Sequence, residues 1–286
     1  MKHKETENGW EWEVNKHTGW WQWKIREIWA YRGLMVQLTR RDMLIRHQQT
    51  LLGPLWLLFQ PCLTMLTYLL VFNKMIGIST GRTPPVLFYL VGIMLWTFFS
   101  ESFLTISNTF IQFGNIFKKI YFPRLIIPLS TLNSQLMRFL LQAGLFVVIS
   151  IVYCIYSGTS VSIKPWLIFA PFAILMAGIN GLSAGLLLAL MTARYRDLVG
   201  VVHLGVRLMM FVTPVLYPIS IVPARVRWIA EINPLTAIFE YCRYAILGEG
   251  TFTSLQILYS LLTTIGLFVV AMMNFSKQAD KLVDVI

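Results

Sequence analysis

Residues 165–193 read PWLIFAPFAILMAGINGLSAGLLLALMTA and contain no Asp, Glu, Lys or Arg. An α-helix needs about 20 predominantly apolar residues to cross the hydrocarbon core of a bilayer, and this stretch exceeds that length. Three further charge-free windows of sufficient length lie between Arg46 and Lys74, between Arg138 and Lys164, and between Glu249 and Lys277. The sequence therefore predicts an all-α polytopic membrane protein.

The composition of the 286-residue chain agrees with this interpretation, since 56% of the residues are hydrophobic and only 13% are charged. Soluble domains carry about 25% charged residues, and a soluble core of this size could not bury so many apolar side chains. This excludes a cytosolic enzyme, a secreted disulfide scaffold and a disordered tail. The three cysteines, Cys62, Cys154 and Cys242, are too widely spaced to indicate a disulfide framework or a metal site. The first 50 residues contain no apolar segment, so we expect no cleavable signal peptide.

Two more stretches qualify as spans with one charge each: 86–107 contains Glu101, and 198–217 contains Arg207. We therefore expect six spanning helices, near 51–73, 86–107, 135–157, 165–191, 198–217 and 254–274. Six spans place both termini on one side, and 16 of the 24 Lys and Arg residues fall on that side, against six on the other. Cytoplasmic loops are enriched in these residues, so we expect an inner-membrane protein with both termini in the cytoplasm.

The N-terminal region is unusual because six of the ten tryptophans fall in the first 29 residues. Trp21, Ile25 and Ile28 recur at helical spacing, with basic residues between them. This pattern is typical of an amphipathic helix that lies in the membrane interface. We expect this interface helix over 19–34, a mobile cytoplasmic tail over 1–18 and the transmembrane domain over 35–286.

A long loop, 218–253, separates the last two predicted spans and is expected on the outer face. Asn233 is suited to cap a helix whose first residue is Pro234, and Gly248 is suited to end it. Apolar residues repeat between them at intervals of three or four. We therefore expect short helices over 218–250 that dip back from the outer surface without crossing the membrane.

The chain lacks the sequence patterns of an ATPase or hydrolase. The phosphate-binding pattern GxxxxGK(S/T) is absent, and residues 77–83 (GISTGRT) have neither its spacing nor its lysine. The four histidines are scattered, and no pair of carboxylates shares a helix face. We therefore expect no catalytic residue, no metal site and no cofactor in this chain.

Three ionisable residues, Glu101, Arg138 and Arg207, lie in or near apolar spans, where a charge is costly and usually faces protein or water. Each is either a substrate contact or gate, or part of a structural ion pair or a side chain that reaches the interface. The structural interpretation is favoured for Arg138. For Glu101 both interpretations remain open.

Aromatic residues make up 14% of the chain, and many lie inside the predicted spans. Aromatic planes can stack on the C–H faces of sugar rings, so an aromatic-lined passage would suit a glycan. The alternative is that these residues form the interfacial belts common to membrane helices, and counting alone favours it. The candidates for lining a channel are Trp56, Phe59, Tyr68, Trp96 and Phe99.

Specific motifs begin at the first span. Arg41-Asp42, residues 45–56 (IRHQQTLLGPLW) and Gln60-Pro61 resemble the opening signature of ABC-transporter permeases that export O-antigen, capsule or teichoic acid. Residues 115–124 (NIFKKIYFPR) are similar to the KxYFPR loop of that family. Residues 233–235 (NPL), followed by 241–244 (YCRY) and 247–248 (LG), are similar to its outer segment. The resemblance covers about residues 35–275.

The resemblance implies a homodimer around one channel, with a separate ABC subunit under each copy that binds ATP and Mg. It implies a lipid-linked polysaccharide, first of all O-antigen, as the substrate, and no nucleic-acid partner. The cytoplasmic loop 108–133 would then couple to the ATPase, and 218–250 would gate the outer mouth. The residues it assigns to coupling are Lys118, Lys119, Tyr121, Phe122, Pro123 and Arg124, and those it assigns to the gate are Asn233, Pro234, Tyr241 and Arg243.

Such a substrate carries a diphosphate, which arginine binds in bidentate fashion. Arg40, Arg41 and Arg46 precede the first span at headgroup depth and are candidates for this contact. The neighbouring Asp42 and the general bias of positive charge towards the cytoplasm explain the same residues equally well.

Three other classes of protein remain possible from the sequence. An exporter of drugs or lipids would share the topology without the first-span and coupling-loop motifs together. An ion-coupled carrier needs charged residues near the middle of the membrane, for which Glu101 is the only candidate. A scaffold protein of the membrane would not need outer gate helices.

Overall fold

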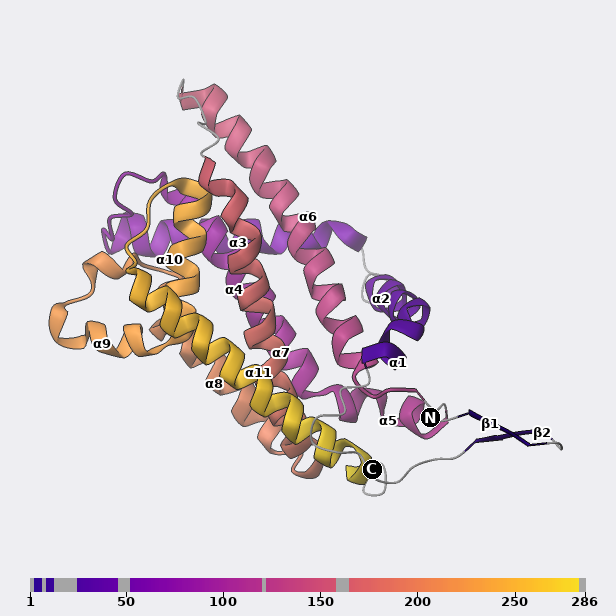
Figure 1. Ribbon diagram of the computed structural model, residues 1–286. Helices are drawn as coiled ribbons and strands as arrows, with labels where there is room; N and C mark the ends of the chain where they lie inside the picture. Colours follow the sequence, from indigo (N-terminus) through magenta and orange to yellow (C-terminus); the bar gives the residue numbers. More distant parts are fainter. Residues whose placement is uncertain are drawn as a thin grey trace.

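The computed structural model describes residues 3–6, 9–12, 25–45, 52–119, 122–157 and 165–282. Long helices form the body of the molecule (Figure 1). Five helical segments in the described part are long and apolar enough to cross a membrane: Gly53–Met75, Pro85–Ser107, Ile126–Ser157, Leu167–Arg194 and Ser254–Lys277. The helical body is thus the membrane protein that the charge-free windows predict.

The expected span over 198–217 is shorter in the structure. Helix α8 covers Leu198–Val212, and Thr213 has an extended backbone with φ −79° and ψ 137°. Pro214 explains this end, because proline lacks an N–H group and pushes the preceding residue out of the helical conformation. Fifteen residues rise about 22 Å, less than the roughly 30 Å of the hydrocarbon core. The described residues therefore form five helices of spanning length and one shorter apolar helix, where six spans were expected.

The first span is irregular. It begins with a 3-10 turn, Gly53–Leu55, continues as α3 (Trp56–Tyr68), and ends as a π-helix, Leu69–Met75. Pro61 lies inside α3 and removes one hydrogen bond from the helix. The backbone of this span is therefore interrupted at several places.

The second span, α4 (Pro85–Ser107), packs against α7 (Ala170–Arg194) and against α6 (Ile126–Ser157). Close approach to α7 depends on two glycines four residues apart. A Cβ atom at Gly181 would lie 3.0 Å from the Phe99 carbonyl oxygen, and one at Gly185 would lie 2.7 Å from the Ile106 Cβ. Small residues at this spacing allow helix backbones to meet in membranes.

Helix α7 is also fastened to α11 (Ser254–Leu282). The buried Asn180 Nδ2 donates a hydrogen bond of 2.7 Å to Thr264 Oγ1. α4, α7 and α11 thus form a packed centre, with α6 on one side of α4.

The N-terminal helices differ in extent from the interface helix expected over 19–34. α1 covers Ile25–Ala30 and α2 covers Arg32–Ile45, so the helical region continues eleven residues beyond the expected end. The expected residues 19–24 lie outside the described part of the chain. α2 packs against α6, on the side of the bundle where α5 (Thr109–Lys119) also lies (Figure 1).

Within the expected tail, 1–18, two short strands occur. β1 (His3–Thr6) and β2 (Gly9–Trp12) pair antiparallel, with His3 opposite Trp12 and Thr6 opposite Gly9. The sequence did not predict this hairpin. It lies apart from the helical body in Figure 1.

The loop between α8 and α11 contains short helices, as its pattern suggested. They are η4 (Ile219–Ile221), α9 (Ala224–Ile232) and α10 (Pro234–Leu247). Elsewhere in the chain, a 3-10 turn, η3 (Pro165–Phe169), precedes α7. Asn233 Oδ1 accepts a hydrogen bond of 3.1 Å from the Leu235 N–H, which caps α10. Gly248 ends α10 in the left-handed conformation, with φ 76°.

Candidate functional site

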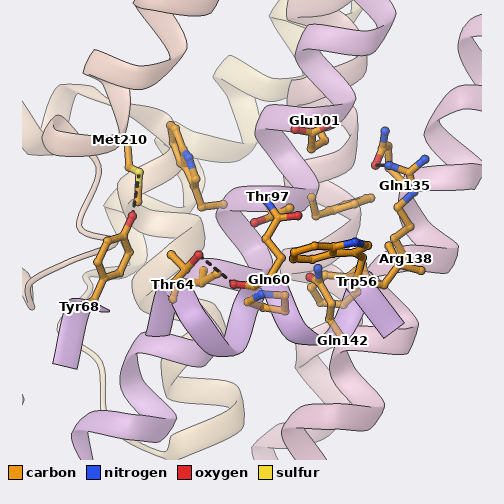
Figure 2. Close-up of a pocket in the computed structure, with 16 residues that line it drawn as sticks. Trp56, Gln60, Thr64, Tyr68, Thr97, Glu101, Gln135, Arg138, Gln142 and Met210 are labelled. Carbon is orange, nitrogen blue, oxygen red and sulfur yellow. Dashed lines mark hydrogen bonds between the residues drawn. The ribbon is translucent and has the colours of Figure 1, made fainter. Parts of the chain in front are cut away.

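A pocket with a volume of about 410 Å³ opens between α3, α4 and α6, and Met210 of α8 closes part of it (Figure 2). This volume falls in the range of about 300–1,000 Å³ that is typical of ligand sites. Sixteen residues line it: Trp56, Leu57, Gln60, Pro61, Thr64, Tyr68, Ile93, Trp96, Thr97, Phe98, Glu101, Gln135, Arg138, Phe139, Gln142 and Met210.

Helical spacing explains how three apolar spans bring polar side chains into one pocket. On α3 the lining residues Trp56, Gln60, Thr64 and Tyr68 recur every four positions, which places them along one face. On α4, Ile93, Thr97 and Glu101 also recur every four positions, and on α6, Gln135, Arg138 and Gln142 are three and four positions apart, which again places them on one face. Each helix therefore turns a narrow polar stripe towards the pocket.

Three of the five aromatic channel candidates line this pocket, and two do not. Trp56, Tyr68 and Trp96 belong to its lining, and the Tyr68 hydroxyl lies 3.8 Å from Met210 Sδ. Figure 2 shows Tyr68 at the end of the pocket opposite Arg138. Phe59 lies outside the lining and is 47% exposed, whereas Phe99 is 2% exposed and packs in the core against Trp96 at a ring distance of 5.6 Å.

Arg138 is both a pocket residue and a member of an ion pair. Its Nη2 lies 3.2 Å from Asp42 Oδ2 on α2, and its Nη1 donates a hydrogen bond of 3.3 Å to Gln135 Oε1. Gln135 in turn donates from Nε2 to Thr105 Oγ1 at 3.3 Å. The ion pair expected for Arg138 is therefore present, and it connects α2 to the wall of the pocket.

The other two ionisable residues of the apolar spans have different surroundings. Glu101 lines the pocket and is partly exposed. Arg207 is exposed on α8 and does not belong to the lining. Of these two residues, Glu101 lines the same pocket as Arg138 and Arg207 does not.

Sequence reasoning missed the polar part of the lining. Gln60, Thr97, Gln135 and Gln142 were not proposed as site residues, yet all four face the pocket. Their signal is the recurrence of amide and hydroxyl side chains at helical intervals inside otherwise apolar spans. Hydrogen-bonding groups beside indole rings suit a polyhydroxylated ligand better than a metal ion.

The expected coupling region comprises α5 and the start of α6. Lys118 and Lys119 are the last residues of α5, Pro123 and Arg124 are partly buried, and Tyr121 lies outside the described residues. Phe122, which the resemblance assigns to coupling, is only 5% exposed. It packs in a cluster with Ile126 and Ile127 of α6 and with apolar residues of α2, so its side chain helps to hold α2 against α6.

The arginines proposed for the diphosphate do not meet in the pocket. Arg40 and Arg41 are exposed on α2, and the Arg41 guanidinium lies 5.3 Å from the centre of the Phe113 ring on α5. Arg46 lies outside the described residues. α2 nevertheless brings a charged residue to the pocket wall, through Asp42.

The expected gate region is built around a buried charge. Arg243 is 1% exposed; its Nη2 donates to the Val215 carbonyl at 2.9 Å and its Nη1 to Glu240 Oε1 at 3.1 Å. The guanidinium also lies 3.9 Å from the centre of the Phe88 ring on α4. Burial lowers the pKa of Arg243, and the Glu240 carboxylate opposes this shift.

The other proposed gate residues support the same helix. Asn233 Nδ2 donates a hydrogen bond of 2.8 Å to Thr213 Oγ1, and Pro234 is the first residue of α10. The Tyr241 ring packs edge-to-face on Phe172 and on Phe252, at 6.0 and 5.5 Å. α10 is thus joined to the end of α8 and to α7.

The loop between the first two spans is fastened to the residues that follow α10. Glu249 Oε2 accepts hydrogen bonds from the Arg82 N–H at 3.1 Å and from Thr83 Oγ1 at 2.9 Å. Glu240 Oε2 accepts one from the Thr251 N–H at 3.0 Å. These contacts close the end of the bundle that the sequence predicts to face outwards.

Comparison with known proteins gives the chain its family. Two proteins of Klebsiella pneumoniae named O-antigen export system permease protein RfbA are each 28% identical to it. The alignment with the first covers 88% of this chain and 95% of the relative. The alignment with the second covers 82% of this chain and 89% of the relative. A Myxococcus xanthus protein of the same name is 30% identical over 68% of this chain and 72% of its own length. The family model described as ABC-2 type transporter matches residues 34–247, and the chain belongs to that family.

Proposed function

We propose that this chain is the membrane-spanning subunit of an exporter that moves a lipid-linked polysaccharide, O-antigen first of all, across the cytoplasmic membrane. The energy comes from ATP hydrolysed by a separate subunit. The observation that carries the proposal is the pocket between α3, α4 and α6, where indole rings and hydrogen-bonding side chains face one space of about 410 Å³. The names of the relatives point to the same class of substrate.

The chemistry of the pocket suits a sugar chain. Trp56 and Trp96 provide aromatic planes for the C–H faces of sugar rings, and amides such as Gln60 and Gln142 provide both donors and acceptors for hydroxyl groups. A drug or lipid exporter would need a mainly apolar pocket. The polar stripes on three helices therefore favour a glycan.

The assembly belongs to the same proposal. Two copies of the chain surround one channel, and an ATP-binding ABC subunit contacts each copy through α5 and residues 120–124. α8 and the residues after it form the sixth crossing, so that both termini lie in the cytoplasm. The distribution of Lys and Arg supports this orientation.

Two aromatic residues of α3 give a matched test. Trp56 and Phe59 are three positions apart and similarly exposed, at 43% and 47%, but only Trp56 lines the pocket. In cells that depend on this chain to export a lipid-linked polysaccharide, Trp56→Ala should lower the polymer at the cell surface roughly two- to tenfold, because a stacking plane is lost. Phe59→Ala should leave export near normal.

The measurement is the ratio of surface polymer to polymer retained inside, at equal amounts of membrane-inserted protein. Polymer lost from the surface should accumulate inside as the lipid-linked form. Equal export by the two variants would remove the pocket from the transport path.

A further inference from the structure

Two charged side chains line the pocket in the part of the chain that the structure describes, and their situations differ. Arg138 is paired with Asp42 at 3.2 Å, and the two side chains are only 11% and 24% exposed. The Asp42 carboxylate therefore partly compensates the positive charge that Arg138 brings to the pocket. Among the described lining residues, the other formal charge is the carboxylate of Glu101.

The Glu101 carboxylate has no hydrogen bond or ion pair with any of the described residues. Its backbone carbonyl accepts from Thr105 Oγ1 at 2.6 Å, but its side chain is left for whatever enters the pocket. Glu101 lies one helical turn beyond Thr97 on α4, and Figure 2 shows both on the same wall of the pocket. Glu101 thus supplies an acceptor of hydrogen bonds and a negative charge at the same place.

Neutral hydrogen-bonding groups face the same space. Gln142 is only 7% exposed, and its amide forms no hydrogen bond with any residue in the described ranges. Because Gln142 lines the pocket, its amide can donate and accept hydrogen bonds with water or a ligand there. The Gln60 amide on the opposite helix is likewise unbonded among the described residues.

The electrostatics of this arrangement discriminate between classes of sugar. A carboxylate accepts two hydrogen bonds from neighbouring hydroxyl groups, and such charge-assisted bonds are stronger than neutral ones. An ammonium group on the sugar gains further attraction to Glu101, whereas a carboxylate or phosphate on the sugar is repelled in a partly desolvated pocket.

We propose that Glu101 makes this pocket selective for sugar units that are neutral or carry an amine, and against acidic units such as uronic acids. The inference rests on the proposed function, because it names the class of sugar that the transport pocket accepts. It also places the diphosphate of the lipid carrier outside this pocket, since that group would face the same repulsion.

The test is direct binding at pH 7 to the purified full-length chain in lipid nanodiscs. The probes are three trisaccharides of similar size: chitotriose as its tri-N-acetyl form, chitotriose with free amines, and trigalacturonate. We expect the acidic probe to bind at least about tenfold more weakly than the neutral probe, and the amine-bearing probe to bind at least as tightly as the neutral one.

Glu101→Gln keeps the shape of the side chain and removes its charge. This variant should bind the acidic probe more tightly. It should bind the neutral probe more weakly, because charge-assisted hydrogen bonds are lost, and the amine-bearing probe more weakly still, so that the three probes no longer differ in affinity according to their charge. Glu231→Gln is the matched control, because Glu231 is a partly exposed carboxylate on α9 outside the pocket lining. It should leave the relative affinities for the acidic, neutral and amine-bearing probes unchanged.

The outcomes separate this inference from the proposed function. Binding of all three probes without an order by charge, or an order that survives Glu101→Gln, overturns the role of Glu101 and leaves the sugar pocket standing. Failure of the wild-type chain to bind any of the three probes overturns both. A normal unfolding temperature for Glu101→Gln shows that altered binding does not come from misfolding.

Discussion

The first and second spans line the same pocket, but the bundle holds them very differently. Their mean hydropathies are similar, 1.8 for Gly53–Met75 and 1.6 for Pro85–Ser107. Yet 78% of the apolar window of the second span is buried in the molecule, against 11% for the first. Hydropathy therefore identifies a span without telling whether protein or lipid surrounds it.

Specific contacts account for the difference. α4 meets two glycines of α7 and is contacted by the buried Arg243, which lies over Phe88. The first span contains Pro61 and ends as a π-helix, and outward-facing residues such as Leu63 and Leu66 are about half exposed. Because α4 is buried and α3 is largely exposed, we interpret α4 as the fixed wall of the pocket and α3 as the weakly held wall. The π-helix that follows α3 agrees with this interpretation, because such segments are frequent at functional sites.

The largest loss in the free energy of unfolding should come from removing the charge of Arg243, which contacts Phe88 of α4. Arg243→Met leaves Glu240, only 3% exposed, without its cationic partner. Breaking a buried ion pair in this way costs about 3–5 kcal/mol. The expected result is a loss of that size in the free energy of unfolding, measured by denaturant titration in mixed micelles.

The control combines Arg243→Met with Glu240→Leu. Removing both charges relieves the uncompensated carboxylate, so the double variant should recover a substantial part of the stability. If the double variant is no more stable than Arg243→Met alone, the unpaired Glu240 carboxylate is not the cause of the lost stability.

Two leucines test the comparison directly, one on each wall. Leu95 on α4 is 1% exposed and Leu66 on α3 is 47% exposed. Leu95→Ala opens a cavity and should cost about 2–5 kcal/mol in the free energy of unfolding. Leu66→Ala removes a group that faces outwards and should cost less than about 0.5 kcal/mol in the same titration. Equal losses would mean that another protein surface, such as a second copy, covers α3.

The fold could be predicted from the sequence as far as the charge-free windows extend. Four charge-free windows, together with the window over 86–107 that holds the single charge of Glu101, indicate the five long helices, because apolar length is the requirement for crossing a bilayer. The window over 198–217 predicted a longer helix than the structure has, because composition does not show that Pro214 ends α8 at Val212. The pairing of β1 with β2 has no apolar signal of this kind.

The site was less predictable, because a single sequence does not show which face of an apolar helix points inwards. Trp56 and Phe59 look equivalent in the sequence, but only Trp56 lines the pocket. The resemblance assigns Phe122 to coupling, but the sequence does not show that its side chain packs beneath α2. Polar residues at helical spacing, such as Gln60 and Thr64, mark the inward face better than the aromatic residues do.

The smallest expected effect concerns the glycines that let α7 approach the fixed wall. A Cβ atom at Gly185 would lie 2.7 Å from the Ile106 Cβ and 3.1 Å from the Phe103 carbonyl oxygen, so α4 or α7 must move to accept it. Overpacking of this kind costs about 1–3 kcal/mol, and it outweighs the gain of about 1 kcal/mol from replacing a helical glycine by alanine. Gly185→Ala should therefore lower the free energy of unfolding.

Gly144 on α6 is the matched control, because a Cβ atom there has no other atom within 4 Å. Gly144→Ala should keep the helix-propensity gain without the clash, and so should be neutral or stabilising by up to about 1 kcal/mol. The two alanine variants are chemically identical substitutions within membrane helices, so the difference between them reports only the closeness of packing. If both variants stabilise the protein equally, α7 does not approach α4 as closely as the structure shows, and α4 is not the fixed wall of the pocket.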